Sequence, residues 1–231
     1  MCGIAELLAN FGYVVSGSDL KRSVVTDQLV TLGVAVHIGH DPQLVSEADV
    51  VVVSSAVTDD NIEVAEARRR NILVIPRAEM LAELMRLRSG IAVAGSHGKT
   101  STTSMIALAL EGGELDPTVV IGGRLNAFGS NARRGQGKYM VAEADESDRS
   151  FLRLTPEIAV ITNVDHEHLE HYGTFEKLCD AFVEFGNAVP FNGSVVGCAD
   201  DEGLRPLLCQ MTRRVLRYGL DEKQPVDVLG S

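Results

Sequence analysis

The 231 residues carry 21 basic and 32 acidic side chains. The formal charge of −11 argues against electrostatic binding to nucleic acid or to an anionic membrane. Hydrophobic residues make up 45% and charged residues 23%, which is typical of globular proteins and excludes the disordered and fibrous classes. No apolar run reaches the roughly 18 residues of a membrane helix, and the four cysteines show no CxxC spacing, so we expect a cytoplasmic protein without nucleic-acid or membrane partners.

In the first 88 residues, short apolar runs alternate with segments of helical period, which indicates parallel βαβ units. The predicted elements are a helix at 3–11, a strand at 13–17, a helix at 23–33, strands at 34–37 and 48–55, a helix at 61–71, a strand at 73–76 and a helix at 77–88. The strand containing Val50 to Val53 should be fully buried. A doubly wound domain opens with a strand, whereas this sequence opens with a predicted helix. We therefore expect residues 1–88 to form an incomplete Rossmann-like parallel sheet domain whose first strand is missing.

The pattern begins again at residue 89, which places a domain boundary near residue 88. The predicted elements are a strand at 90–95, a helix at 100–113, strands at 118–123, 138–144 and 157–163, a helix at 175–189, and strands at 193–199 and 213–220. Residues 221–231 trail off without closing a domain, so we expect a C-terminal truncation as well. The fold class is α/β, with a nucleotide-binding domain over residues 89–231.

The strongest functional signal is GSHGKTSTT, residues 95–103, between a predicted buried strand and a helix. Backbone amides and a helix N-terminus can hold phosphate oxygens there, while Lys99 would bridge the outer phosphates and Thr100 would bind Mg²⁺. Val93 stands where the longer phosphate-loop motif has a glycine, so only the shorter GxxGKT form is present. An ordinary βα turn is the competing interpretation, but a lysine at a helix start opposes the helix dipole. The predicted ATP-binding residues are Gly95, Ser96, His97, Gly98, Lys99, Thr100 and Ser101.

Two further motifs follow predicted strands. Residues 141–148, VAEADESD, place four carboxylates within six positions, and a cation would relieve their mutual repulsion. Residues 162–173, TNVDHEHLEHYG, hold three histidines among carboxylates. Zinc is one interpretation of that second motif, but no cysteine joins it and a phosphate loop favours magnesium. We expect one histidine to be a metal ligand or a nearby base, and the other two to be surface or helix-start residues.

With these motifs in this order, the chain resembles the Mur ligases of bacterial cell-wall synthesis, particularly the branch that adds L-alanine to UDP-N-acetylmuramate. The motifs that carry the resemblance are SGSDLKRS, VVVSSAV, PRAEMLAELMR, GSHGKTSTT, GGRLNAFGSNAR, EADESDRSFL, TNVDHEHLEHYG and FEKLCDAF. Ser96 replaces the usual threonine of the family, and His166 stands where alanine or proline is common. The resemblance begins after the opening strand of the family and stops inside its central P-loop ATPase domain, so we expect a fragment that lacks the C-terminal domain.

The resemblance implies a reaction in which ATP phosphorylates the muramoyl carboxylate and the amine of L-alanine attacks the acyl phosphate. It implies Lys99, Glu143 and His168 as catalytic residues, and Thr100, Glu143 and His168 as metal-binding residues. The residues that it implies for the UDP-sugar substrate are Ser18, Asp19, Ser54, Ser55, Asn126, Asn131, Ser147 and Asp148. His37 and His40 lie in a different unit from the phosphate loop and are interpreted as loop residues.

Three alternatives remain. A sibling ligase could join a preformed peptide to the muramoyl sugar, or belong to the folate-polyglutamate branch, with the same chemistry. A catalytically inactive module could keep the UDP-sugar site alone. A dinucleotide-dependent oxidoreductase rests only on the βαβ start and lacks a GxGxxG turn. Oligomeric state and metal identity are not predicted.

Overall fold

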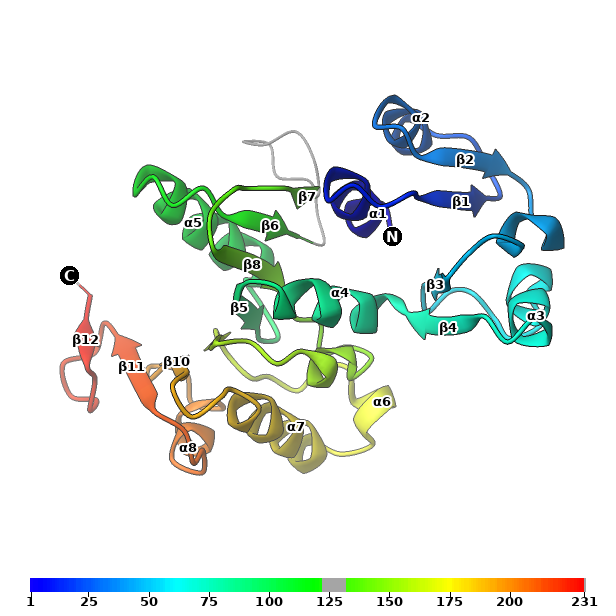
Figure 1. Cartoon of the computed structure of the whole chain (residues 1–231). Coiled ribbons are helices and arrows are strands. Elements are labelled where there is room, and N and C mark those ends of the chain that lie inside the picture. Colours follow the sequence, from blue (N-terminus) through cyan, green and yellow to red (C-terminus); the bar gives the residue numbers. More distant parts are fainter. Residues whose placement is uncertain (122–131, 231) are drawn as a thin grey trace.

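The computed structural model describes residues 1–121 and 132–230. Figure 1 shows the N-terminal part as two small strand pairs with helices, next to a larger sheet that carries helices on both faces. The elements up to residue 86 are α1 (Cys2–Asn10), β1 (Ser16–Asp19), α2 (Val24–Thr31), β2 (Ala35–Ile38), the 3-10 helix η1 (Pro42–Val45), β3 (Val50–Val53), α3 (Ile62–Arg69), β4 (Leu73–Pro76) and α4 (Arg77–Arg86). The α/β class is confirmed.

The strands of the N-terminal part form two separate parallel pairs, β1 with β2 and β3 with β4 (Figure 1). Within residues 1–121 and 132–230, no strand pairs with both β1 and β3, so the pairs do not merge into one sheet. The prediction that Val50–Val53 is fully buried is wrong, because all four residues are half-buried. A strand with one neighbour lacks the cover that a central strand receives on both sides.

Capping side chains account for the starts of α2 and α3. Ser23 caps α2 in a reciprocal capping box with Thr26, and the Asn61 side chain accepts hydrogen bonds from two amides at the start of α3.

The first predicted strand lies later than expected, at Ser16–Asp19 instead of 13–17. Of the residues that the structure covers, no helix is long and apolar enough to cross a membrane.

The remaining elements build one eight-stranded sheet. They are β5 (Ser89–Ala94), α5 (Lys99–Gly112), β6 (Thr118–Val120), β7 (Ala132–Arg133), β8 (Tyr139–Glu143), the 3-10 helix η2 (Ser150–Arg153), β9 (Ile158–Ile161), α6 (Leu169–Tyr172), α7 (Phe175–Asn187), β10 (Ser194–Cys198), α8 (Arg205–Leu208), β11 (Val215–Gly219) and β12 (Val228–Leu229). The strand order is β12-β11-β10-β9-β5-β8-β6-β7, parallel except for the β6–β7 pair. Residues 221–231, for which no strand was predicted, contribute β12, which extends the sheet beside β11.

The central strands alternate between two apolar layers, as the two-residue period of a strand requires. On β5, Ala92 and Ala94 join the large core that contains Phe182 of α7, whereas Ile91 and Val93 join the smaller core under α5. In the large core the ring of Phe151 packs edge-on against that of Phe182, with centroids 5.4 Å apart. The strands β5, β8 and β9 lie in the middle of the sheet, and apolar side chains pack on both of its faces there. The carboxyl ends of these three strands lie at the same edge of the sheet.

Candidate active site

The three predicted motifs follow three adjacent strands, β9, β5 and β8, and β5 is the central one. In the register, Val93 of β5 lies beside Glu143 of β8 and beside Val160 of β9. Because all three strands are parallel, the phosphate loop, the acidic segment and the histidine segment begin at the same carboxyl edge. Open α/β sheets bind their ligands at this edge, next to a change in strand order.

The phosphate loop is residues 95–98, between the end of β5 and the first residue of α5, Lys99. Gly95 has φ +134° and Gly98 has φ +79°, conformations that side chains other than that of glycine rarely adopt. A Cβ on Gly95 would lie 2.0 Å from Thr162 Oγ1, so the loop also needs the space. The amides of the first turn of α5 have no helical acceptors, so they are available to an anion.

The segment after β9 holds this loop in place. The Ser96 amide donates to Asn163 O at 3.1 Å, and the His97 amide donates to Asn163 Oδ1 at 2.8 Å. His97 O accepts from Thr162 Oγ1 at 2.7 Å and from Asn163 Nδ2 at 3.0 Å, while Ser96 Oγ accepts from the Asp165 amide at 2.9 Å. Thr162 and Asn163 therefore shape the loop, a role that the sequence interpretation missed. The sequence signal that could have indicated this role is the pair of polar residues directly after a predicted strand.

The Lys99 ammonium reaches into the edge between β5 and β8. Its Nζ donates to Gly95 O at 2.7 Å and to Glu146 Oε1 at 2.7 Å, and it lies 3.4 Å from Ser96 O. Nε2 of His168 lies 3.7 Å from the same Glu146 oxygen. Lys99 and His168, predicted from motifs about 70 residues apart, thus converge on one carboxylate.

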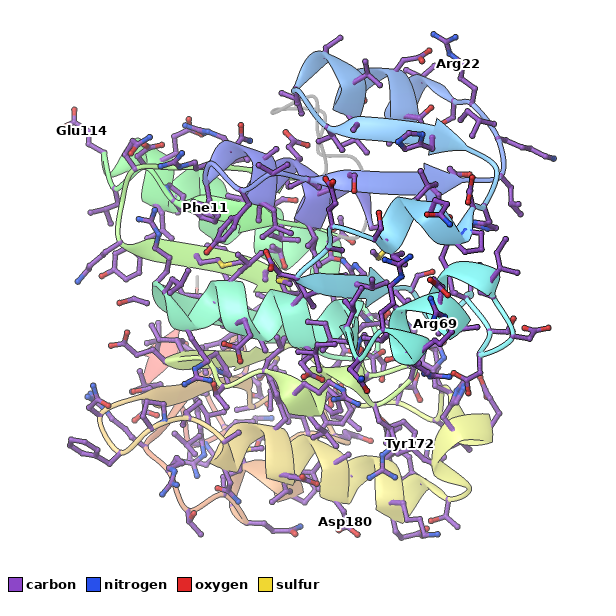
Figure 2. The ribbon with its side chains drawn as sticks, turned by 45° about the vertical axis from the view of Figure 1, so that its right-hand side comes forward. Phe11, Arg22, Arg69, Glu114, Tyr172 and Asp180 are labelled. Carbon is purple, nitrogen blue, oxygen red and sulfur yellow. The ribbon has the colours of Figure 1, made fainter. Side chains whose placement is uncertain are left out.

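Glu146 is another residue that the sequence interpretation did not single out. Its side chain is fully buried, at 0% exposure, and no other described residue makes a hydrogen bond to Oε2. Burial raises the pKa of the Glu146 carboxyl, and the hydrogen bond from Lys99 opposes this effect. Tyr172, labelled in Figure 2 close to α6, donates through its hydroxyl to Glu146 O at 2.6 Å and fixes the main chain there.

The histidines of the third motif differ in their surroundings. His168 lies at the start of α6 with φ +56° and is half-buried. His166 and His171 are exposed, as expected for two of the three, and the ring of His166 stacks on Phe175 with centroids 3.7 Å apart. The backbone N–H of His166 and the ring of His97 hold the pKa of Asp165 below its usual value.

The predicted metal ligands lie at the shared edge without forming a ready-made cage. Glu143 ends β8 and is half-buried, while Thr100 is exposed in the first turn of α5. Over the described ranges, no three His, Cys, Asp or Glu side chains group closely enough to hold a metal ion. A cation would thus need further ligands, such as phosphate oxygens and water, which is how proteins usually bind Mg²⁺.

The predicted sugar-site residues fall in two places. Ser147 and Asp148 lie in the turn after β8, where the Ser147 amide donates to Asp145 Oδ1 and Asp148 Oδ1 accepts from the Ser150 amide. Ser54 and Ser55 follow β3, Ser18 and Asp19 end β1, and Asn126 and Asn131 lie outside the described residues.

Ser18 belongs to a polar cluster at the end of β1. Its Oγ donates to Glu63 Oε2 at 2.7 Å and lies 3.0 Å from His40 Nδ1. His40 is in a loop, as predicted, and contacts both Ser18 and Glu63. The prediction that His37 is a loop residue is wrong, because His37 lies in β2. Glu63, in the first turn of α3, was not predicted. The period of an isolated helix does not reveal which neighbour its first turn meets.

Comparison with known proteins agrees with this arrangement. The description "Mur ligase family, catalytic domain" matches residues 1–89, and "Mur ligase middle domain" matches residues 93–228. UDP-N-acetylmuramate–L-alanine ligases from Geotalea daltonii and Geobacter sulfurreducens are 59% and 56% identical, over 95% and 98% of this chain. These alignments cover 48% and 49% of the relatives, so the chain spans about half the length of the curated relatives it matches.

Solved structures show the same similarity. The UDP-N-acetylmuramate:L-alanyl-γ-D-glutamyl-meso-diaminopimelate ligase from Neisseria meningitides has a TM-score of 0.85 and 28% identity, covering 94% of this chain and 74% of that one. The UDP-N-acetylmuramate–alanine ligase from Thermotoga maritima has a TM-score of 0.82 and 29% identity, covering 97% of this chain and 50% of that one. The match to the middle domain alone spans more than half of the length of this chain, so this chain belongs to the Mur ligase family.

Proposed function

We propose that this chain provides the nucleotide-binding and carboxylate-activating part of an ATP-dependent ligase that joins L-alanine to UDP-N-acetylmuramate in the cytoplasm. The observation that carries the proposal is the convergence of Lys99 and His168 on one carboxylate beside a glycine loop. The identity of 56–59% to L-alanine ligases supports the choice of substrates.

In the proposed reaction, an oxygen of the muramoyl carboxylate attacks the terminal phosphorus of ATP, and ADP leaves. The amine of L-alanine then attacks the acyl carbon, the amide bond forms, the C–O bond to phosphate breaks, and inorganic phosphate leaves with the amine proton released to solvent. The protein contributes positioning and charge neutralisation. Amides of the first turn of α5, which lack helical acceptors, hold phosphate oxygens, and Lys99 neutralises the group being transferred.

The donor atoms at the edge fit a magnesium ion, which requires hard oxygen ligands. When bound, Mg²⁺ held by Thr100 and Glu143 would neutralise phosphate charge, with His168 next to a second ion or to the acyl phosphate. Ser147 and Asp148 would face the sugar. Ser18, Asp19, Ser54 and Ser55 would line the uridine nucleotide site, and Asn126 and Asn131 would meet the muramoyl group.

A second candidate is ligation of a preformed peptide to the same sugar nucleotide. The similarity to the ligase that acts with the diaminopimelate-containing peptide favours this alternative, because the alignment covers 74% of that solved chain. Both candidates predict the same nucleotide site, and they differ in the amine that the site consumes. ADP release measured with UDP-N-acetylmuramate and either L-alanine or the preformed peptide would separate them.

The proposal is tested by calorimetric titration of the chain with Mg-ATP, comparing the wild type with Lys99→Ala. We expect the wild type to bind and the variant to lose at least 10-fold in affinity, which is the scale of a charge-assisted contact of about 1.5–3 kcal/mol. Lys177→Ala removes an exposed lysine from the first turn of α7 and serves as a matched control with unchanged affinity. Binding of UDP-N-acetylmuramate without any binding of Mg-ATP would instead identify an inactive sugar-binding module.

A further inference from the structure

The Lys99 ammonium is already saturated with protein acceptors. It has three N–H bonds, and three oxygen atoms lie around it, two from the loop carbonyls of Gly95 and Ser96 and one from Glu146. A phosphate oxygen can reach this ammonium only by replacing or sharing one of these partners. The Glu146 carboxylate is the only charged partner of the three.

The Glu146 carboxylate is not required to hold its own segment of chain. Its main-chain oxygen accepts from the buried Tyr172 hydroxyl at 2.6 Å, and the Arg149 amide also donates to this oxygen. Its Oε2 has no hydrogen-bond partner among the residues described, although the side chain is fully buried. Burying a carboxylate with one oxygen unsatisfied is costly. Such a group is best explained by a role toward Lys99 or toward a ligand.

We infer that Glu146 substitutes for a phosphate in the nucleotide-free loop, because its carboxylate positions the Lys99 ammonium and competes with the outermost phosphate for it. The inference rests on the proposed nucleotide-binding function and adds a positioning residue to it. Phosphate and carboxylate are both anions, so each would form a charge-assisted hydrogen bond to the one Lys99 ammonium and the two would compete for it. A neutral side chain of the same shape should therefore favour nucleotide binding.

The experiment measures the Kd of Mg-ATP by calorimetry for the wild type, Glu146→Gln, Lys99→Ala and the double variant. We expect Glu146→Gln to lower the Kd on the order of 10-fold, because a neutral amide holds the Lys99 ammonium less strongly than the carboxylate does and so competes less with the phosphate. In the Lys99→Ala background the same substitution should lower it less than about 3-fold, because there is no ammonium to compete for. Asp180→Asn, on the exposed surface of α7 (Figure 2), removes the same charge elsewhere and should leave the Kd unchanged.

Several outcomes would overturn the inference. If Glu146→Gln binds Mg-ATP as the wild type does, or more weakly, while Lys99→Ala loses affinity, Glu146 is no competitor and the proposed function survives. An equal gain in both backgrounds would indicate a general charge effect without Lys99. If the wild type does not bind Mg-ATP, both proposals fail together.

A second measurement covers the case in which Glu146→Gln does not fold. In the wild-type chain labelled with ¹³C at glutamate, saturation with Mg-ATP should shift the Glu146 carboxyl resonance, because Lys99 leaves or shares it. An unchanged resonance at saturation contradicts the inference.

Discussion

Gly95→Ala tests whether the phosphate loop depends on its contact with the segment after β9. The added Cβ would lie 2.0 Å from Thr162 Oγ1 and 3.1 Å from both the N and the O of Asn163. The first distance is far below any van der Waals contact, so Thr162 must rotate or the loop must move. The φ of +134° adds strain, since side chains rarely adopt it.

The magnitude follows from these contacts. Backbone strain of this kind costs about 1–3 kcal/mol. Displacing Thr162 Oγ1 breaks its bonds to His97 O at 2.7 Å and Ala94 O at 3.3 Å, at about 0.5–1.5 kcal/mol each. We expect a total loss of roughly 2–6 kcal/mol, a large fraction of the roughly 5–15 kcal/mol that stabilises a typical domain.

Gly98→Ala is the matched control, because Gly98 also has a positive φ of +79° but nothing lies within 4 Å of an added Cβ. This control should cost only about 1–2 kcal/mol. Urea unfolding should show a midpoint for Gly95→Ala that lies well below that of Gly98→Ala, with the same m-value. Thr162→Ala added to Gly95→Ala removes the overlap, so the double variant should be no less stable than Gly95→Ala alone. Equal midpoints for the two glycine variants would refute the reasoning.

Three further predictions concern other parts of the chain. Asp201→Ala removes the acceptor of the Val164 and Leu204 amides, at 3.2 and 2.7 Å, and should cost about 1–3 kcal/mol by thermal unfolding, whereas Asp201→Asn, which keeps an oxygen acceptor, should cost less. Ser23→Ala removes the capping box of α2 and should cost about 1 kcal/mol in urea unfolding, and a change below about 0.3 kcal/mol would contradict the cap. Burial raises the pKa of Tyr218 to about 12, above the roughly 10 of an unfolded tyrosine, so its contribution to stability is complete below pH 10 and is lost as pH rises through 12. Tyr218→Phe should therefore reduce the loss of stability between pH 10 and 12, and equal losses in both proteins would count against the shift.

The sequence alone determined the local chemistry of this protein. Glycines before Lys99, carboxylates after one strand and histidines after another were each visible as short motifs in a period-2 or period-3.6 context. These signals depend only on residues close together in the chain. The α/β class, most element types and the meeting of Lys99 and His168 at one edge could therefore be predicted from the sequence.

Only the tertiary structure decided which groups touch across the chain. Glu146 was one of four carboxylates in its motif, and its burial against Lys99 depends on β8 lying next to β5. Thr162 and Asn163 support the phosphate loop because β9 flanks β5 on the other side. The half-burial of Val50–Val53 and the addition of β12 to the sheet likewise depend on strand pairing. Strand order is set by the packing of distant segments, and no short window of residues contains that information.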